Sequence, residues 1–444
     1  MSLPSYLAYK DSGVDWLERV PANWTITPLK GCFTIYGGST PKSDEAAFWD
    51  GEIVWVSPAD LSKLSTLYIN DSARKITDAG LSSCGTKLVP EGSIVLSTRA
   101  PIGSLAIAKT ELCTNQGCKS LVPKAGVDEL FYAYCLLAST EALNLRGKGT
   151  TFLELSADEL GAFKVPLPPF DEQAAVAAFL NRETGKIDIL IAEQEKLLAL
   201  LAEKRQATIS HTVTRGLNPD APMRDSGYAW MSLVPAHWAV AGLGYIASVE
   251  NGTTPSRDVE EYWRDGNIPW LASGEVNQLH IRDATEYITD AALKNCSLRL
   301  LPVGTVIVGM IGQGKTRGMS ARLLISATIN QNLAAICPGP RMDGGYLLYV
   351  FHAVYEWLRE AGRGGNQAAM NCQMLSSLRI PVPPIEEQRA ILDFIEAETT
   401  RLDALKAEVE RGIELLRERR SALVSAAVTG KIDVRNAVPE ELAA

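Results

Sequence analysis

Two stretches of the chain carry its longest regular pattern of hydrophobic positions. Residues 171–214 and 386–429 contain no proline, and each stretch of 44 residues would span about 66 Å as a helix. Apolar side chains fall there on a three-four spacing, which is typical of a coiled-coil seam. The seam positions are Leu180, Ile187, Leu190, Leu197 and Leu201 in the first stretch and Ile395, Leu402, Leu405, Val409 and Leu416 in the second. One helix cannot bury such a stripe alone, so we expect the two to form an antiparallel coiled coil, although the pattern also permits a parallel pair.

The remainder of the chain predicts a mixed α/β fold. Short β-branched runs such as residues 92–96 and 304–308 are bounded by glycine and proline, which favours short strands. Helical spacing over residues 130–139 and 346–360 adds a few helices.

The chain is also a tandem duplication. Residues 10–24 recur as residues 224–238, and the later shared motifs keep an offset of 212 to 215 residues. These motifs are Gly38-Ser-Thr-Pro41 with Gly252-Thr-Thr-Pro255, Trp49 and Trp55 with Trp263 and Trp270, Ile76-Thr-Asp-Ala79 with Ile288-Thr-Asp-Ala291, Asn115-Gln116 with Asn330-Gln331, and residues 165–173 with 380–388. We therefore expect two globular domains, in residues 1–165 and 216–380. A long helix follows each domain, the first in residues 166–215 and the second, together with the C-terminal tail, in residues 381–444.

The distribution of charge changes what the composition suggests. A net charge of -9 argues against a polycation that coats nucleic acid. However, no acidic residue lies between Asp290 and Asp343, where six basic residues give +6, and the matching residues 79–127 give +3. Both copies concentrate positive charge in the same subregion, as contacts to DNA phosphates require.

Taken together, these motifs resemble the specificity subunit of type I restriction-modification systems. The resemblance rests on Trp-x3-Val-Pro-Ala-x-Trp at the head of each copy, Gly-x-Thr-Pro before a tryptophan pair, Asn-Gln, Pro-x-Pro-Pro-x-[Asp/Glu]-Glu-Gln opening each long helix, and Ala-Val-Thr-Gly-Lys-Ile-Asp at residues 427–433. It implies that each globular domain recognises one half of a bipartite double-stranded DNA target. It also implies that the helices set the spacer and dock two methyltransferase subunits, to which restriction and translocase subunits add.

Two loops at matching places differ in sequence, as two domains that read different half-sites require. They are residues 97–103 and 309–318, and they supply Arg99, Gln313 and Arg317 as candidate base readers and Lys315 as a phosphate contact. Further candidate DNA contacts are Lys42 and Arg257, just after the Thr-Pro turns, and Arg322. Because both copies share Asn-Gln, we interpret that pair as structural or backbone-positioning.

Residues 309–316 also match the Walker A pattern of nucleotide-binding loops. That loop must open a helix, whereas residues 321–325 here favour a strand, and the first copy lacks the Gly-Lys-Thr insertion. We therefore interpret the match as coincidental, and ATP hydrolysis abolished by Lys315→Ala would contradict this interpretation.

Other chemistry is sparse. Four scattered histidines and eight cysteines without a Cys-x-x-Cys pair predict no metal site, and we expect no catalytic centre and no cofactor. No bilayer-spanning run or N-terminal signal is visible, so we expect a reduced, cytoplasmic protein without a membrane partner.

Two other functions fit the residues. The chain could be a free-standing sequence-specific or architectural DNA-binding protein without a methyltransferase, or a scaffold whose domains bind protein. Co-purification with a methyltransferase would separate the first hypothesis from these two, and salt-dependent DNA binding would separate the two from each other.

Overall fold

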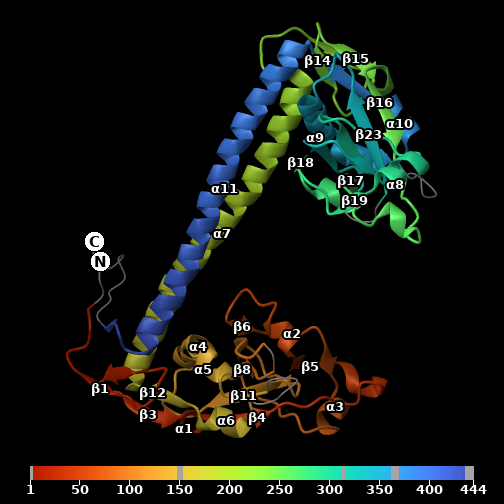
Figure 1. Ribbon diagram of the computed structural model, residues 1–444. Coiled ribbons are helices and arrows are strands. Elements are labelled where there is room, and N and C mark those ends of the chain that lie inside the picture. The colour runs from red at the N-terminus through yellow and green to blue at the C-terminus, as the bar shows by residue number, and fades with distance from the viewer. Residues whose placement is uncertain (1–3, 100, 148–153, 312–315, 362–369, 436–444) are drawn as a thin grey trace. The chain divides into compact units, whose positions relative to one another are not determined.

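The computed structural model describes residues 4–99, 101–147, 154–311, 316–361 and 370–435 (Figure 1). Its contacts divide the chain into two compact units. The first unit consists of Met1–Glu195 with Arg411–Ala444, and the second of Lys196–Glu410. Each unit therefore contains one globular part and one half of each long helix.

A five-stranded mixed sheet forms the centre of the first unit. Its strand order is β4-β11-β8-β9-β6, in which only β6 runs parallel to its neighbour. The strands are β4 Phe33–Gly37, β11 Cys118–Pro123, β8 Ile94–Ser97, β9 Leu105–Ala108 and β6 Tyr68–Ile69. Ile94 and Leu96 contact the helical layer, while Val95 belongs to the cluster on the opposite face. Because both faces of the sheet are covered, the β8 run is apolar throughout, without polar alternation.

Helices cover one face of this sheet and a smaller sheet lies on the other side. The helices are α1 Leu29–Cys32, α4 Glu129–Ala138, α5 Thr140–Asn144 and α6 Ala157–Ala162. The smaller sheet, in the order β10-β5-β7, comprises β10 Cys113–Thr114, β5 Trp49–Val56 and β7 Lys75–Ile76, with η1 Ala46–Phe48, α2 Pro58–Leu61 and α3 Asp78–Ser82 beside it. Two antiparallel ribbons complete the unit: β1 Tyr9–Asp11 with β2 Arg19–Pro21, and β3 Thr25–Pro28 with β12 Lys164–Leu167.

The second unit repeats this topology. Its larger sheet, in the order β16-β23-β20-β21-β18, comprises β16 Ala247–Asn251, β23 Leu333–Pro338, β20 Val306–Gly309, β21 Ser320–Leu323 and β18 His280–Ile281. Its smaller sheet comprises β19 Glu286–Ile288, β17 Ile268–Leu271 and β22 Thr328–Ile329, and its ribbons are β13 Met223–Asp225 with β14 Leu233–Pro235 and β15 Ala239–Gly242 with β24 Arg379–Val382. The helices are η2 Leu243–Tyr245, η3 Glu260–Tyr262, η4 Ser273–Asn277, α8 Asp290–Asn295, α9 Gly344–Ala361 and α10 Cys372–Ser377. The predicted mixed α/β fold and its duplication are thus confirmed.

The long helices α7 (Phe170–Arg215) and α11 (Ile385–Val428) run side by side and antiparallel (Figure 1). In the first unit, Asp188 pairs with Arg420 at 2.8 Å and Glu195 pairs with Arg417 at 3.1 Å. In the second unit, Arg205 pairs with Asp403. Partner numbers fall along α11 as they rise along α7, so the antiparallel arrangement is confirmed and the parallel alternative is excluded.

Burial along the predicted seam depends on what lies beside it. Leu180 and Ile395 are fully buried because they also contact the globular cores, and Ile187 and Leu402 are buried too. Leu201, Val409 and Leu416 are partly buried. In contrast, the side chains of Leu190, Leu197 and Leu405 are 46%, 39% and 38% exposed. Two helices cover only one side of each other, so an apolar stripe broader than their contact stays partly open.

Each long helix is tied to its globular part by one buried glutamine. Gln388 Oε1 accepts from the Asp343 backbone N–H at 2.8 Å, and its Nε2 donates to the carbonyls of Arg341 and Pro383 at 2.9 and 2.8 Å. Gln173 makes the equivalent three bonds in the first unit. The glutamine that ends each Pro-x-Pro-Pro-x-[Asp/Glu]-Glu-Gln motif therefore satisfies backbone groups that would be costly to leave unpaired.

Two further structural findings bear on the composition. All eight cysteines are free thiols. In the part of the chain that the structure describes, no helix has both the length and the apolar character needed to cross a bilayer.

Candidate nucleic-acid interface

Three loops meet at one edge of the first globular part. They are the Thr-Pro turn (residues 38–42), the Asn-Gln turn (residues 115–117) and the described part of the β8–β9 loop (residues 98–99 and 101–104). Together we call them the three-loop edge. The Ser39 N–H donates to the Thr114 carbonyl at 2.9 Å, and the Thr40 hydroxyl bonds to Gln116 Oε1. The Thr98 N–H donates to the Gly117 carbonyl at 2.8 Å. Hydrogen bonds therefore join loops that lie far apart in sequence.

The second globular part builds the same three-loop edge from residues 252–257, 330–332, 310–311 and 316–319. The Thr253 N–H donates to the Ile329 carbonyl at 3.1 Å, and Thr254 Oγ1 donates to Gln331 Oε1 at 2.5 Å. The Met310 N–H donates to the Asn332 carbonyl at 2.9 Å. The scaffold of the edge is thus duplicated along with the fold.

A tryptophan pair supports each Thr-Pro turn from beneath. In the first unit, Trp55 Nε1 donates to the Ser39 carbonyl and Trp49 Nε1 to the Lys42 carbonyl, both at 3.0 Å. The two rings meet edge to face, with centroids 5.2 Å apart. Trp270 and Trp263 make the corresponding bonds to Thr253 and Ser256 at 3.1 and 3.0 Å. The indole N–H groups thus fix the path of the turn, which explains why the two motifs occur together.

The glycine of each Thr-Pro turn lies directly against the Asn-Gln segment. A Cβ at Gly38 would stand 1.9 Å from the Asn115 carbonyl oxygen, and one at Gly252 would stand 1.7 Å from that of Ile329. Both neighbours are backbone atoms that cannot swing aside. Only glycine therefore permits the turns to approach this closely.

The structure brings four of the predicted DNA contacts to the three-loop edges. Lys42 is exposed at the end of its turn, and Arg99 is exposed beside Glu154, whose carboxylate lies 3.2 Å from Nε. Arg257 follows the second Thr-Pro turn, and Arg317 lies partly buried in the β20–β21 loop.

The other three predicted contacts are not on the described part of these edges. Gln313 and Lys315 lie outside the described residues. Arg322 lies in β21, and its Nη1 approaches Gly345 at the start of α9, so its side chain faces the helical layer.

The Walker A match lacks the helix that its chemistry requires. Thr316–Met319 form a turn, and Ser320–Leu323 form strand β21, as the sequence predicts. The helix N-terminus that would face the phosphates of a nucleotide is therefore replaced by a strand.

An arginine stacks on each tryptophan pair, but from a different sequence position. Arg257 lies 3.7 Å from the Trp263 ring centroid and makes two hydrogen bonds to Glu286, at 2.6 and 2.9 Å. These bonds hold the pKa of the Glu286 carboxyl below its usual value. In the first unit, Arg74 lies 3.5 Å from the Trp49 ring centroid.

Arg74 is a residue that the sequence reasoning missed. In the alignment of the two copies, Arg74 stands opposite Glu286, a residue of opposite charge. The alignment therefore gives no sign that Arg74 corresponds in space to Arg257. Within the described residues, no carboxylate is ion-paired with Arg74, whereas its neighbour Lys75 is paired with Asp71 at 3.2 Å. The first edge therefore offers a stacked cation whose charge is uncompensated, while the second offers a neutral Arg–Glu pair.

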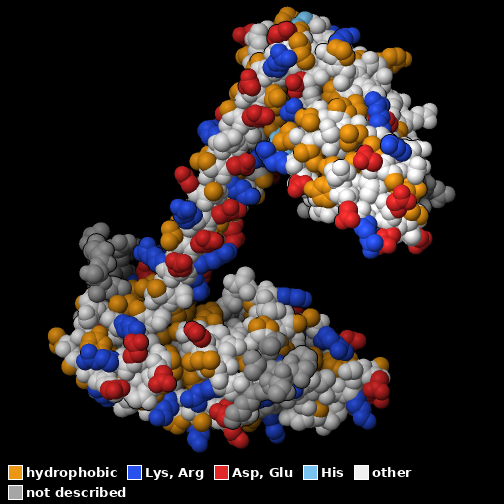
Figure 2. All heavy atoms as spheres, in the orientation of Figure 1, with side chains coloured by type: hydrophobic (Ala, Val, Ile, Leu, Met, Phe, Trp, Pro, Cys, Tyr) orange, Lys and Arg blue, Asp and Glu red, His pale blue; other side chains and the backbone are white. Residues whose placement is uncertain are grey.

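In the folded units, nearby carboxylates neutralise part of the positive charge counted in the two basic segments. Arg299, one of the six basic residues between Asp290 and Asp343, pairs with Glu250 at 2.9 Å. Figure 2 shows Lys and Arg interspersed with Asp and Glu on the visible surface of each unit. On this visible face, positive charge is therefore not gathered into one broad basic patch.

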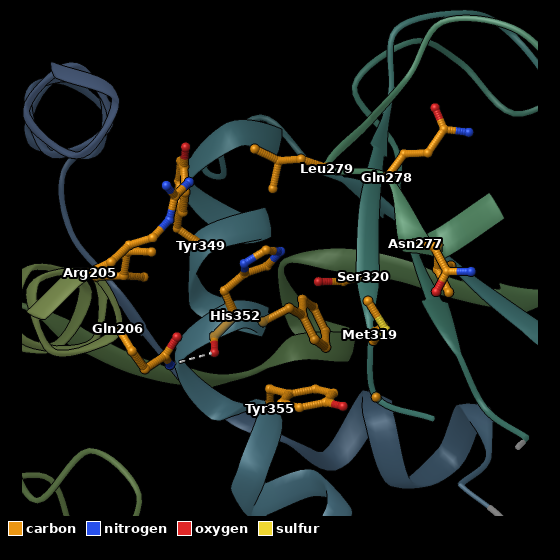
Figure 3. Close-up of a pocket in the computed structure, with 14 residues that line it drawn as sticks. Arg205, Gln206, Asn277, Gln278, Leu279, Met319, Ser320, Tyr349, His352 and Tyr355 are labelled. Carbon is orange, nitrogen blue, oxygen red and sulfur yellow. Dashed lines mark hydrogen bonds between the residues drawn. The ribbon is translucent and has the colours of Figure 1, made fainter. Parts of the chain in front are cut away.

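Each unit also contains a crevice between its helical layer and the long helices. In the second unit it encloses about 440 Å³, and Figure 3 shows His352 between α7 and β21, with Gln206 Nε2 donating to its carbonyl at 3.1 Å. Burial lowers the pKa of His352, which favours a neutral ring. The lining of this crevice contains neither a carboxylate nor a thiol, and the buried Ser320 hydroxyl in it makes no hydrogen bond to another residue that the structure describes.

The first unit has a crevice of about 560 Å³ at the corresponding place, lined by Tyr134, Thr184 and Arg420 among others. Tyr134 OH and Thr184 Oγ1 are hydrogen-bonded at 3.0 Å. The crevices are thus a second duplicated feature, adjoining the β9 and β21 ends of the β8–β9 and β20–β21 loops.

Comparison with known proteins agrees with this architecture. The chain is 28% identical over 341 residues to the type I restriction enzyme MjaIX specificity subunit of Methanocaldococcus jannaschii, covering 75% of this chain and 76% of that protein. A solved structure from a study of complex assembly in the type I R-M system matches 92% of this chain and 98% of its own, with a TM-score of 0.71 at 17% identity. The HsdS subunit from Thermoanaerobacter tengcongensis matches 93% and 98%, with a TM-score of 0.56 at 16% identity. These structures share the fold.

A family model matches the chain twice, once on each repeat. The matched residues are 21–199 and 235–415, which include both three-loop edges and most of both long helices. The chain therefore belongs to the family of the type I restriction modification DNA specificity domain.

Proposed function

We propose that this chain is the DNA-sequence-recognition subunit of a type I restriction-modification complex, in which each globular domain reads one half of a bipartite target. The observation that carries the proposal is the duplicated three-loop edge. The two edges share their hydrogen-bonded scaffold, while the cations placed on them differ. A shared scaffold with different side chains on it is what we expect of two domains that bind DNA in the same way but read different half-sites.

We assign recognition to residues 1–165 and 216–380. At the first edge, Arg99 is a candidate for bidentate pairing with guanine and Lys42 for a phosphate. At the second, Arg257 and Arg317 take part, with Gln313 and Lys315 of the same loop. Arg99 and Arg257 already hold carboxylates, so DNA would have to displace Glu154 and Glu286 from them. We do not extend the proposal to Arg322.

The long helices, in residues 166–215 and 381–444, set the spacer between half-sites and dock two methyltransferase subunits. Exposed apolar side chains on these helices, including Leu190, Leu197 and Leu405, are suited to burial against partners. Restriction and translocase subunits add to this complex. The chain supplies specificity, while methylation and ATP-dependent cleavage come from the partner subunits. We place the complex in the cytoplasm, in keeping with eight free thiols.

Domain exchange with methylation sequencing tests the proposal. The chain is co-expressed with its methyltransferase, and adenine methylation of the host genome gives the bipartite motif. Replacing residues 25–165 with the corresponding part of another family member should change one half-site and leave the other intact. A change in both half-sites would contradict modular reading, and failure to co-purify with a methyltransferase would favour a free-standing DNA-binding protein.

A further inference from the structure

The glutamine of each Asn-Gln turn is exposed at the surface yet held in one orientation. Gln116 is exposed, and the Thr40 hydroxyl bonds to its Oε1. Gln331 is also exposed, and Thr254 Oγ1 donates to its Oε1 at 2.5 Å. In both units, the threonine of one turn therefore fixes the amide of another.

The backbone beneath these glutamines is equally constrained. Asn115 Oδ1 accepts from the Gly117 N–H at 2.9 Å, and the Asn115 N–H donates to the Val56 carbonyl at 2.9 Å. Asn330 makes the matching bonds to Asn332 and Leu271, both at 3.0 Å. Each glutamine thus projects from a turn that is closed by its own asparagine and anchored to the smaller sheet.

The amide nitrogens are the groups left for a ligand. The threonine hydroxyl already bonds to the Oε1 atom of each glutamine. Neither Gln116 Nε2 nor Gln331 Nε2 has a hydrogen-bond acceptor among the residues that the structure describes. A side-chain amide carries two N–H donors on this nitrogen. Because the side chain is already ordered, a ligand that accepts from these donors avoids most of the entropic cost of fixing it.

The duplication indicates which part of DNA accepts these bonds. Residues that read bases must differ between domains with different half-sites, as the surroundings of Arg99 and Arg257 do. Gln116 and Gln331 are identical, on identical scaffolds. A contact common to both domains suits the part of DNA that does not vary with sequence, the sugar–phosphate backbone, and side-chain amides are among its usual donors.

We infer that Gln116 and Gln331 are phosphate contacts, one per recognition domain, that fix the register of each domain on its half-site. This inference rests on the proposed function, because it assigns a role within the same DNA-recognition surface. It goes beyond a purely structural role for the Asn-Gln pair, since the asparagine closes the turn while the glutamine faces outward.

Binding to a duplex of random sequence tests the inference, because a phosphate contact acts on any sequence. Gln116→Ala and Gln331→Ala in the full chain should each weaken binding about tenfold, and the double variant about a hundredfold. Gln116→Glu should bind more weakly than Gln116→Ala, because a carboxylate repels phosphate. The salt dependence of the alanine variants should match that of the wild type, since a neutral amide releases no counterion.

Two further variants separate a phosphate contact from a mere link between turns. Thr40→Val keeps Gln116 but removes the hydroxyl that orients it, so it should weaken binding less than Gln116→Ala. Gln278→Ala is the matched control, because this exposed glutamine already donates to Glu275 at 3.0 Å, and it should bind as the wild type does. Thermal unfolding of each variant shows whether the fold is retained.

The possible failures are distinguishable. If Thr40→Val and Gln116→Ala weaken binding equally, the glutamine only links the turns and the inference is wrong. If Gln116→Glu binds as well as Gln116→Ala, no phosphate faces the amide and the inference is wrong as well. If the wild-type chain shows no salt-dependent DNA binding, the proposed function itself fails.

Discussion

At the scale of single residues, both units stack an arginine on the tryptophan pair, but the arginine comes from a different sequence position in each unit. The first unit uses Arg74 from beside β7, and the second uses Arg257 from the Thr-Pro turn, with Glu286 at the repeat position of Arg74. Both tryptophan pairs therefore carry a stacked arginine, but within the described residues only the arginine of the second unit is neutralised by a carboxylate. Long-range electrostatics at the two edges should differ accordingly, because Glu286 cancels the cation in the second unit.

Arg74→Ala tests this difference in charge. Removing an uncompensated cation should lower DNA affinity and reduce the slope of log affinity against log salt by about one. Lys75→Ala is the control, since Lys75 is already paired with Asp71 and should contribute less. Titrations at several salt concentrations measure both quantities. Equal slopes for Arg74→Ala and the wild type would mean that Arg74 serves only to pack on Trp49.

Gly38→Ala tests the close approach of the turns at the first edge. The added methyl group would overlap the Asn115 carbonyl, so we expect the free energy of unfolding to fall by about 1–3 kcal/mol. Gly85→Ala is the matched control, because a Cβ at Gly85 would have no neighbouring atom within 4 Å and the change should stay within about 0.5 kcal/mol. Denaturant unfolding gives both values, and similar values for the two variants would contradict the packing argument.

At the scale of elements, the buried glutamines at the helix starts are the clearest links between domain and helix. Gln388→Ala would leave the Asp343 N–H and the Arg341 and Pro383 carbonyls without their side-chain partner. We expect the free energy of unfolding to fall by roughly 2–4 kcal/mol. Glu386→Ala, two residues earlier and exposed, should change it little. Comparable losses in the two variants would show that the hydrogen bonds of Gln388 contribute little.

The elements were largely predictable from the sequence, because periodicity and proline punctuation are local. The long helices expected over 171–214 and 386–429 extend over Phe170–Arg215 and Ile385–Val428. Exposure along the seam was not predictable, since a three-four pattern marks the apolar stripe but not how much of it a partner covers. Leu180 and Leu190 look alike in sequence, yet only Leu180 has a globular core beside it.

The sequence predicted which loops form the candidate site but not the contacts between those loops. The Thr-Pro turns, the Asn-Gln turns and the variable loops were each visible as motifs, yet the hydrogen bonds that join them connect residues such as Thr40 and Gln116, far apart in sequence. The pairing of Arg257 with Glu286 and the inward direction of Arg322 also depend on tertiary structure. Counting charge between Asp290 and Asp343 also overstated the free positive charge of that segment, because Arg299 pairs with Glu250 from another part of the chain.

At the scale of the whole molecule, the proposed function makes helix length a determinant of the DNA target. A seven-residue insertion preserves the coiled-coil seam and adds about 10 Å to a helix, or roughly three base pairs of DNA. Inserting one heptad after Glu195 in α7 and another after Glu410 in α11 lengthens both helices at nearly opposite positions, as the pairing of Glu195 with Arg417 indicates.

We expect the double insertion to lengthen the unread spacer by roughly three base pairs while both half-sites stay the same. The physical reason is that the bases are read by the globular domains, which the insertion leaves untouched, whereas the separation of the half-sites follows the helices. Methylation sequencing in the host reads spacer and half-sites together. The same heptad in α7 alone is the control, because it shifts the ion pairs of one helix against the other and should impair methylation. An active double-insertion variant with an unchanged spacer would show that the helices do not measure the distance between half-sites.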